Sequence, residues 1–234
     1  VDEEGDWVVR DDVFVRYQTK DELKVGGLSI GFTGYGGKHH IGPEFQLGHI
    51  VGTGFEEPVL LIKTAWGGKS IHKDFRPPSA GGTIGEYYQK MIAEYRQGLI
   101  KIGNDFPHLA NLNPVLSGFV WFQGWNDMFD ETARRDYKSN LIHLINDLRE
   151  EVKQPDLPIV IGELGNGGLD ANKNMLSIRS AQKAAAQELG SNAVFVPTSQ
   201  FARPAQDSPN DGHGHHWFGN AESYFLIGDA LGKA

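Results

Sequence analysis

One stretch of the sequence, Gly118 to Asp130, constrains the fold of this chain more than any other. It begins as a continuous apolar run, Gly-Phe-Val-Trp-Phe, which is typical of a strand buried on both faces. At Gly124 the run gives way to polar residues. In an open α/β sheet, ligands bind beyond the carboxyl ends of the strands. Gln123, Asn126 and Asp127 are therefore the first candidates for chemistry, although a buried strand followed by an ordinary polar turn would give the same pattern.

The composition limits the class of protein. With 234 residues the chain is long enough for one large domain with a proper core. A net charge of −8, with no block of Lys and Arg, argues against a nucleic-acid groove. No apolar run approaches the length of a membrane span. The absence of cysteine excludes disulfides and thiolate metal sites.

Apolar runs and amphipathic segments alternate along most of the chain. Buried strands are predicted at Pro58–Ala65, from Gly118, at Leu157–Leu164 and at Ala193–Pro197. Helices are predicted at about 41–51, 85–102, 132–152, 175–189 and from Ala221 to the C-terminus. This alternation predicts an α/β fold with a mostly parallel sheet and helices on both faces. We expect the four strands to be parallel neighbours in one sheet, with a gap or a foreign strand between the first two.

The N-terminal part has a different pattern. Trp7 to Tyr17 contains two short β-like runs around Arg10-Asp11-Asp12, which predicts a surface hairpin. Gly26 to Gly37 is a glycine-rich loop without the strand and helix context of a dinucleotide site. It also lacks the Lys-Ser/Thr ending of a phosphate loop, so nucleotide binding is not expected.

A second polar concentration, Asp211-Gly-His213-Gly-His215-His216-Trp217, precedes the final helix. Three histidines this close could ligate a metal ion. No separated acidic or histidine motif completes such a site, however. A histidine that acts as a general base, facing donors at the strand ends, is the more economical interpretation.

Three motifs together resemble one known family. They are Trp-Phe-Gln-Gly-Trp-Asn-Asp (Trp121 to Asp127), Lys-Thr-Ala-Trp-Gly-Gly-Lys-Ser (Lys63 to Ser70) and the run from His215 to Gly228. They are similar to the sialate O-acetylesterase and acetylxylan-esterase branch of the SGNH hydrolases, and the resemblance covers nearly the whole chain. It implies one domain, residues 1–234, with a flavodoxin-like three-layer α/β/α sandwich. The implied reaction removes acetyl groups from carbohydrates with a serine nucleophile and no cofactor.

The family's functional positions map onto this sequence residue by residue. The backbone N–H of Gly68 and the side-chain amide of Asn126 correspond to oxyanion donors. The histidine base corresponds to His216, with His215 as the alternative and Asp211 as the carboxylate that orients it. The family's last motif is Asp-x-x-His, whereas here Asp211-x-x leads to Gly214. Substrate contacts are expected from Gln123, Asp127, Trp66, Trp125 and Trp217.

The N-terminal part of the chain lacks the serine motif of the family. No Gly-Asp-Ser or Gly-Gln-Ser-Asn motif with its nucleophilic serine is present, and neither Ser29 nor Ser70 has that context. In this topology the first strand lies inside the sheet, so its absence leaves backbone groups unpaired. We therefore expect a segment upstream of Val1, or a separate chain, to supply the strand and the serine.

Two alternatives remain open. The run Trp7 to Tyr17 could take the place of the missing strand in a catalytically silent, carbohydrate-binding relative. A metal-dependent hydrolase that uses the histidine cluster is the third hypothesis. A carbohydrate esterase of this kind is expected to be secreted or periplasmic, with an acetylated carbohydrate as its only partner besides the serine segment, and without nucleic acid or membrane.

Overall fold

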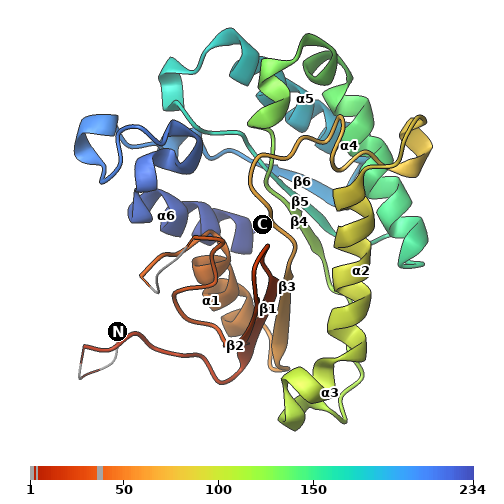
Figure 1. The fold of residues 1–234 in the computed structure, drawn as a ribbon, viewed down its shortest axis with the longest axis vertical. Coiled ribbons are helices and arrows are strands. Elements are labelled where there is room, and N and C mark those ends of the chain that lie inside the picture. The colour runs from red at the N-terminus through yellow and green to blue at the C-terminus, as the bar shows by residue number, and fades with distance from the viewer. Residues whose placement is uncertain (1–2, 4, 36–38) are drawn as a thin grey trace. The chain divides into compact units, whose positions relative to one another are not determined.

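The computed structural model describes residues 3, 5–35 and 39–234. The chain forms two compact units. The first unit comprises residues 1–67, 91–114 and 221–233, and the second comprises residues 68–90 and 115–220 together with residue 234. Each unit contains one small sheet with its own helices (Figure 1).

The sheet of the first unit has three strands, in the order β2-β1-β3. They are β1 (Val13–Gln18), β2 (Leu23–Gly27) and β3 (Val59–Lys63). β1 pairs antiparallel with β2 and parallel with β3. Successive side chains of a strand point to opposite faces, so β1 contributes to two cores. Val13, Val15 and Tyr17 pack in one buried cluster and Phe14 packs in another.

Helices cover both faces of this sheet. On the first face, α1 (Glu44–Gly54) approaches so closely that a Cβ at Gly52 would lie 2.2 Å from Val13. α6 (Ala221–Gly232) packs on α1. The second face is covered by α3 (Ile102–Asp105) and by the part of α2 (Glu86–Ile100) that belongs to this unit. The ring of Phe14 lies 5.2 Å from that of Phe106, just beyond α3. The first unit is therefore a three-layer α/β/α arrangement.

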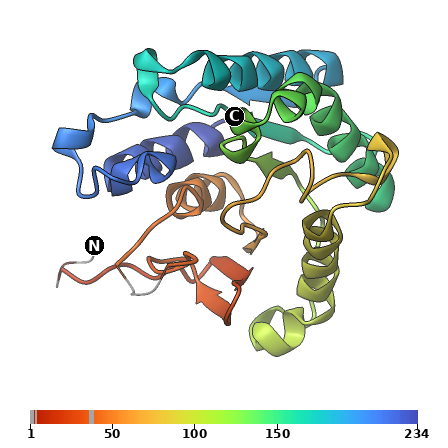
Figure 2. The same ribbon diagram turned by 45° about the horizontal axis from the view of Figure 1, so that its top comes forward.

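The sheet of the second unit is entirely parallel, in the order β4-β5-β6. Its strands are β4 (Phe119–Trp121), β5 (Ile159–Gly162) and β6 (Ala193–Val196). Two long helices, α4 (Glu131–Glu151) and α5 (Lys173–Leu189), lie side by side against it (Figure 2). Both helices begin at a side-chain cap: Asp130 accepts the N–H of Ala133, and Asn172 accepts those of Asn174 and Met175.

Short 3₁₀ turns occupy many of the connections. They are η1 (Pro78–Ala80), η2 (Pro107–Leu109), η3 (Asn126–Phe129), η4 (Gly168–Asp170), η5 (Ser199–Phe201), η6 (Ala205–Asp207) and η7 (Gly214–Gly219). In the second unit, η3 carries Asn126 and Asp127, and η7 carries His215 and His216.

The structure confirms the mixed α/β class, the helices expected from residue 41 onward and the parallel pairing of the strands β4, β5 and β6. The predicted hairpin within Trp7–Tyr17 is wrong. Its second half is the single strand β1, whose antiparallel partner is β2. Five of its six residues are buried because β1 is the central strand, and a central strand has no surface side. Gly26 and Gly27 belong to β2, and positions 36–38 of the expected glycine-rich loop lie outside the described residues.

The four predicted strands fall in two hydrogen-bonded sheets, with β3 in one and β4, β5 and β6 in the other, as the expected gap between the first two allows. β3 pairs with β1, and no strand of the described residues joins β3 to β4. A strand forms hydrogen bonds along two edges only, and those of β1 are taken by β2 and β3. The run Trp7–Tyr17 therefore does not take the place of a strand between β3 and β4.

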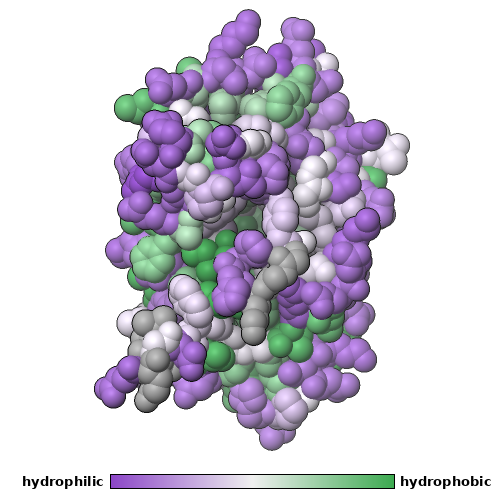
Figure 3. Space-filling model, turned by 60° about the vertical axis from the view of Figure 1, so that its left-hand side comes forward, coloured by the Kyte–Doolittle hydropathy of each residue, from purple (hydrophilic) through white to green (hydrophobic). Residues whose placement is uncertain are grey.

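The face drawn in Figure 3 is mainly polar, because hydrophilic residues predominate on it and hydrophobic areas are smaller. Among the residues that the structure describes, no helix is long and apolar enough to cross a membrane.

Candidate active site

A compact turn, Gly68 to Phe75, opens the second unit. Gly68 has a φ of +73°, in the left-handed region that favours glycine, and it is exposed. The carbonyl of Ser70 accepts the N–H groups of Asp74 and Phe75, and the Asp74 carboxylate accepts the N–H of Ser70 at 2.8 Å. The same carboxylate accepts the Ser70 hydroxyl at 3.1 Å. Ser70 is thus a structural hydroxyl of this turn, as expected from its context.

The loop that follows β4 lies against this turn. Gly124 is packed so closely that a Cβ there would lie 2.9 Å from Ile178 of α5. Asn126 then begins η3. A Cβ added to Gly68 would lie 3.9 Å from Nδ2 of Asn126. The two residues expected to act as oxyanion donors are therefore neighbours.

Asp127 does not lie where a sugar could reach it. Its exposed fraction is 0%. Its carboxylate accepts the N–H groups of Ile71 and His72, both at 3.0 Å, and Nε2 of Gln123 at 2.6 Å. Burial raises the pKa of the Asp127 carboxyl group, while these hydrogen bonds act in the opposite direction. The predicted substrate contact of Asp127 is wrong, because both of its oxygens bind the protein.

The histidines lie in and just before η7. Asn166, which follows β5, donates from Nδ2 to the carbonyl of Gly214 at 2.9 Å and so holds this turn to the strand end. Trp217 and Phe218 have φ values of +51° and +55°, a left-handed conformation that is strained for bulky residues. Such strain concentrates at functional sites. The two strained residues directly follow His216 in the chain.

Trp217 is a core residue. It is 4% exposed, and its ring stacks on Phe122 at a centroid distance of 6.4 Å. Its predicted role as a sugar-stacking surface is therefore wrong, because its faces are covered by the protein.

Another tryptophan of the second unit, Trp125, lies at the histidines. The rings of Trp125 and His215 are 5.9 Å apart, and those of His215 and His216 are 4.3 Å apart. His213 and His215 are exposed, as is Asp211, whereas His216 is half-buried. Trp125 directly precedes Asn126, so the oxyanion residues and the histidine turn meet through this one side chain.

The distances between the three histidine rings bear on the hypothesis of a metal site in this turn. The ring centroids of His213 lie 5.1 Å from His215 and 6.3 Å from His216. Within residues 3, 5–35 and 39–234, no group of three or more His, Asp or Glu side chains could hold a metal ion.

The environment of His216 predicts a dependence of stability on pH. Burial, together with the nearby His215 and His213, lowers the pKa of His216 from 6.5 to about 4. Between these two values the unfolded chain binds more protons than the folded one. The free energy of unfolding should therefore fall as the pH is lowered from about 6.5 to 4. In a His216→Gln variant this contribution disappears. Urea denaturation at pH 7 and pH 4.5 should show a smaller loss of stability for the variant, and equal losses would contradict the lowered pKa.

Gly165, three residues after β5, predicts a packing effect. A Cβ at Gly165 would lie 2.3 Å from Oγ1 of Thr198 and 2.7 Å from the backbone nitrogen of Ser199. Gly165→Ala should therefore lower the free energy of unfolding by about 1–3 kcal/mol, as overpacked cores do. Gly54→Ala, where the added Cβ meets nothing within 4 Å, is the control. Equal denaturation midpoints for the two variants would refute the close approach.

Sequence reasoning missed the residues that support the site. Tyr137 of α4 and Gln182 of α5 both bind the Gln123 carbonyl, at 2.7 and 2.9 Å. Nothing in the sequence around Asn166 predicted its hydrogen bond to the Gly214 carbonyl. Gln123 itself donates to the carbonyl of Lys69 at 3.0 Å. Trp66 belongs to the first unit, where its indole N–H donates to the carbonyl of Gln18 at 3.0 Å.

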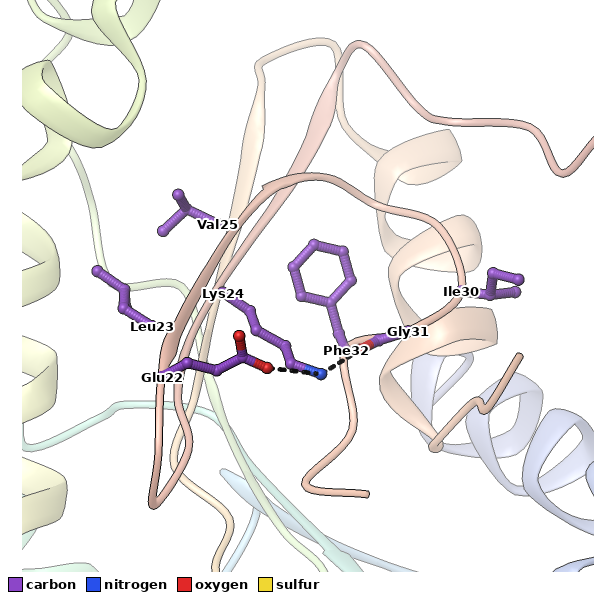
Figure 4. Close-up of a pocket in the computed structure, with 7 residues that line it drawn as sticks. All are labelled: Glu22, Leu23, Lys24, Val25, Ile30, Gly31 and Phe32. Carbon is purple, nitrogen blue, oxygen red and sulfur yellow. Dashed lines mark hydrogen bonds and ion pairs between the residues drawn. The ribbon is translucent and has the colours of Figure 1, made fainter. Parts of the chain in front are cut away.

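The first unit has a cavity of about 520 Å³ (Figure 4). It is lined by Glu22, Leu23, Lys24, Val25, Ile30, Gly31 and Phe32. Nζ of Lys24 donates to the carbonyl of Gly31 at 2.9 Å inside it. None of the residues predicted from the sequence to be functional lines this cavity.

Comparisons with known proteins bear on this arrangement. Residues 16–231 match the family described as carbohydrate esterase, sialic acid-specific acetylesterase. The chain belongs to this family. The resemblance expected from its three motifs is thereby confirmed, as is the general assignment to carbohydrate esterases of the SGNH type. No curated protein sequence matches the chain.

Two solved structures are similar to this carbohydrate esterase in fold. A protein from Arabidopsis thaliana has a TM-score of 0.65 and 19% identity, over 97% of this chain and 81% of its own. XAC1771, described as a carbohydrate acetylesterase from Xanthomonas citri, has a TM-score of 0.59 and 16% identity. That match covers 96% of this chain and half of XAC1771. At these identities the likeness shows the fold, a three-layer α/β/α hydrolase fold.

Proposed function

We propose that this carbohydrate esterase is an O-acetylesterase that removes acetyl groups from sugars by serine-based acyl transfer. The observation that carries the proposal is the pairing of Gly68 with Asn126, since a Cβ at the first would lie 3.9 Å from Nδ2 of the second. An exposed backbone N–H and a side-chain amide at one point can both donate to an oxygen that becomes negatively charged. The half-buried His216 lies on a turn that reaches the same loop through Trp125.

The proposed reaction combines these groups with a serine hydroxyl. A serine hydroxyl attacks the acetyl carbonyl carbon while His216 accepts its proton. The carbonyl oxygen becomes an oxyanion, which the N–H of Gly68 and the amide of Asn126 stabilise. The intermediate expels the sugar oxygen, which takes the proton from His216. Water then cleaves the acetyl-serine with His216 as base, which yields acetate and restores the serine. Asp211 is proposed to orient His216.

The serine is proposed to come from outside these 234 residues, either from an upstream segment or from a separate chain. The reason is that the sequence has no Gly-Asp-Ser or Gly-Gln-Ser-Asn motif. The hydroxyl of Ser70 is engaged with Asp74 at 3.1 Å, within its own turn.

The sugar is proposed to lie against Trp125. This ring is close to Phe129, at 6.0 Å, and the Phe129 side chain is 67% exposed. Trp125 is half-buried and Phe129 is exposed, and accessible aromatic faces suit the apolar faces of a pyranose ring. A secreted or periplasmic location is proposed because acetylated polysaccharides occur there.

A catalytically silent carbohydrate-binding relative is the second candidate, favoured by the same missing serine motif. The decisive experiment treats the full natural protein with a fluorophosphonate, locates the modified serine by peptide mass mapping, and measures acetate release from acetylated sugars. Modification of one serine with loss of acetate release supports the esterase. Sugar binding without modification or acetate release supports the silent relative.

A further inference from the structure

We propose that Asp127 is a positioning residue of the esterase site, which fixes the distance between its two oxyanion donors. Asp127 adjoins Asn126 in the chain, and its carboxylate binds the turn that begins at Gly68. The inference rests on the proposed function and deepens it, because it assigns a task to a residue that touches neither substrate nor nucleophile.

The contacts of the carboxylate define the task. Oδ2 accepts the N–H of Ile71 and Oδ1 accepts that of His72, both at 3.0 Å across 55 residues or more of sequence. Oδ2 also accepts Nε2 of Gln123 at 2.6 Å. Because one carboxylate binds two successive backbone N–H groups, it fixes both the position and the orientation of the turn relative to Asp127. Three residues before Ile71, the same turn presents the N–H of Gly68.

Gln123 provides a second connection between the same two segments. Its amide donates to the carbonyl of Lys69 at 3.0 Å as well as to Asp127. The backbone carbonyl of Gln123 accepts hydrogen bonds from the Tyr137 hydroxyl at 2.7 Å and from the Gln182 side-chain amide at 2.9 Å. The turn is therefore connected through Gln123 and Asp127 to helices α4 and α5, which are rigid elements.

A carboxylate is chemically suited to this place. Asp127 is completely buried, and its hydrogen bonds come from two backbone amides and one side-chain amide. Burying a charge costs free energy unless it is well hydrogen-bonded. An ionised carboxylate accepts through both oxygens, whereas an asparagine offers one acceptor and turns an N–H₂ group toward an N–H donor. Asparagine should thus break at least one of the three contacts while preserving the volume of the side chain.

The geometric demand of the reaction makes this connection important. Donors must meet the oxyanion at hydrogen-bond distance, and a misplacement of about 1 Å can cost a hundredfold in rate. With Asn126 on η3 and Gly68 on the other segment, a looser turn separates the donors without removing either. The loss should appear in kcat and not in KM, because the donors act on the transition state.

The test compares Asp127→Asn and Asp127→Ala with Asp130→Ala in the full natural protein. Asp130 is an exposed carboxylate three residues away that caps α4 by accepting the N–H of Ala133 at 2.8 Å. Its removal also costs stability but leaves the turn untouched. Amide exchange of Ile71 and His72, the amide resonance of Gly68, and kcat and KM on an acetylated sugar are measured for each.

For Asp127→Asn we expect faster exchange at Ile71 or His72, a shifted Gly68 resonance, and a kcat lowered about ten- to a hundredfold with KM within about twofold. Asp130→Ala should match the wild type in all of these. Unchanged exchange and an unchanged Gly68 resonance in Asp127→Asn would overturn the inference, as would equal effects in Asp130→Ala. If the wild type releases no acetate, the proposed function fails, and the exchange and resonance data alone decide whether Asp127 holds the turn.

Discussion

Replacing His216 with alanine is expected to lower kcat/KM on acetylated sugars by about 10²–10⁴-fold, the usual contribution of a general base. The physical reason is that the reaction requires a neutral imidazole to take the serine proton. Burial and two neighbouring histidines keep His216 neutral, with a pKa of about 4. The hydrogen bond from Asn166 to the Gly214 carbonyl holds its turn in place, even though Trp217 and Phe218 have a strained backbone.

The measurement uses acetate release from an acetylated sugar and hydrolysis of a nitrophenyl acetate. His213→Ala and His215→Ala are the matched controls, since both of these side chains are exposed on the same turn. A loss confined to His216 supports the assignment. A loss confined to His215 moves the base by one residue. Equal losses at all three, with release of a bound metal ion, would show that the chemistry is metal-dependent.

The core strands could be predicted because their signal is local. β4, β5 and β6 are short apolar runs, the first two followed by glycine-containing turns, and such a run needs no distant partner to be recognised. β1 was mistaken for part of a hairpin because its preceding segment contains Arg10 and Asp12, which resemble a turn. These two residues instead pair with each other before the strand begins. Only its pairing with β2 and β3 shows that β1 is central.

The candidate site, like the strands, could be predicted only where a local sequence pattern marks its residues. Gly68 and Asn126 were predicted as oxyanion donors from two sequence motifs, and the structure places them next to each other. The tasks of Asp127 and Trp217 could not be predicted, because burial depends on distant partners. For Asp127 these are the N–H groups of Ile71 and His72, which no sequence pattern marks as donors. A polar residue at a strand end looks the same whether it faces a ligand or a neighbouring turn.

Replacing Asn126 with alanine is the second large effect that we expect. Loss of one oxyanion donor typically lowers kcat by about 10²–10³-fold. The amide of Asn126 forms its full hydrogen bond only when the carbonyl oxygen has gained negative charge. The ground state is bound almost equally well without it, so KM should change little.

Asn192→Ala is the matched control for this change. Asn192 also carries a side-chain amide in the second unit, but its Nδ2 donates to Asp156 at 3.3 Å on an exposed surface. The two variants should have similar denaturation midpoints, and only Asn126→Ala should lose turnover. A raised KM with unchanged kcat would mean that Asn126 binds the substrate and the transition state equally. An unchanged kcat and KM would remove Asn126 from the mechanism and leave the N–H of Gly68 without its partner at the oxyanion.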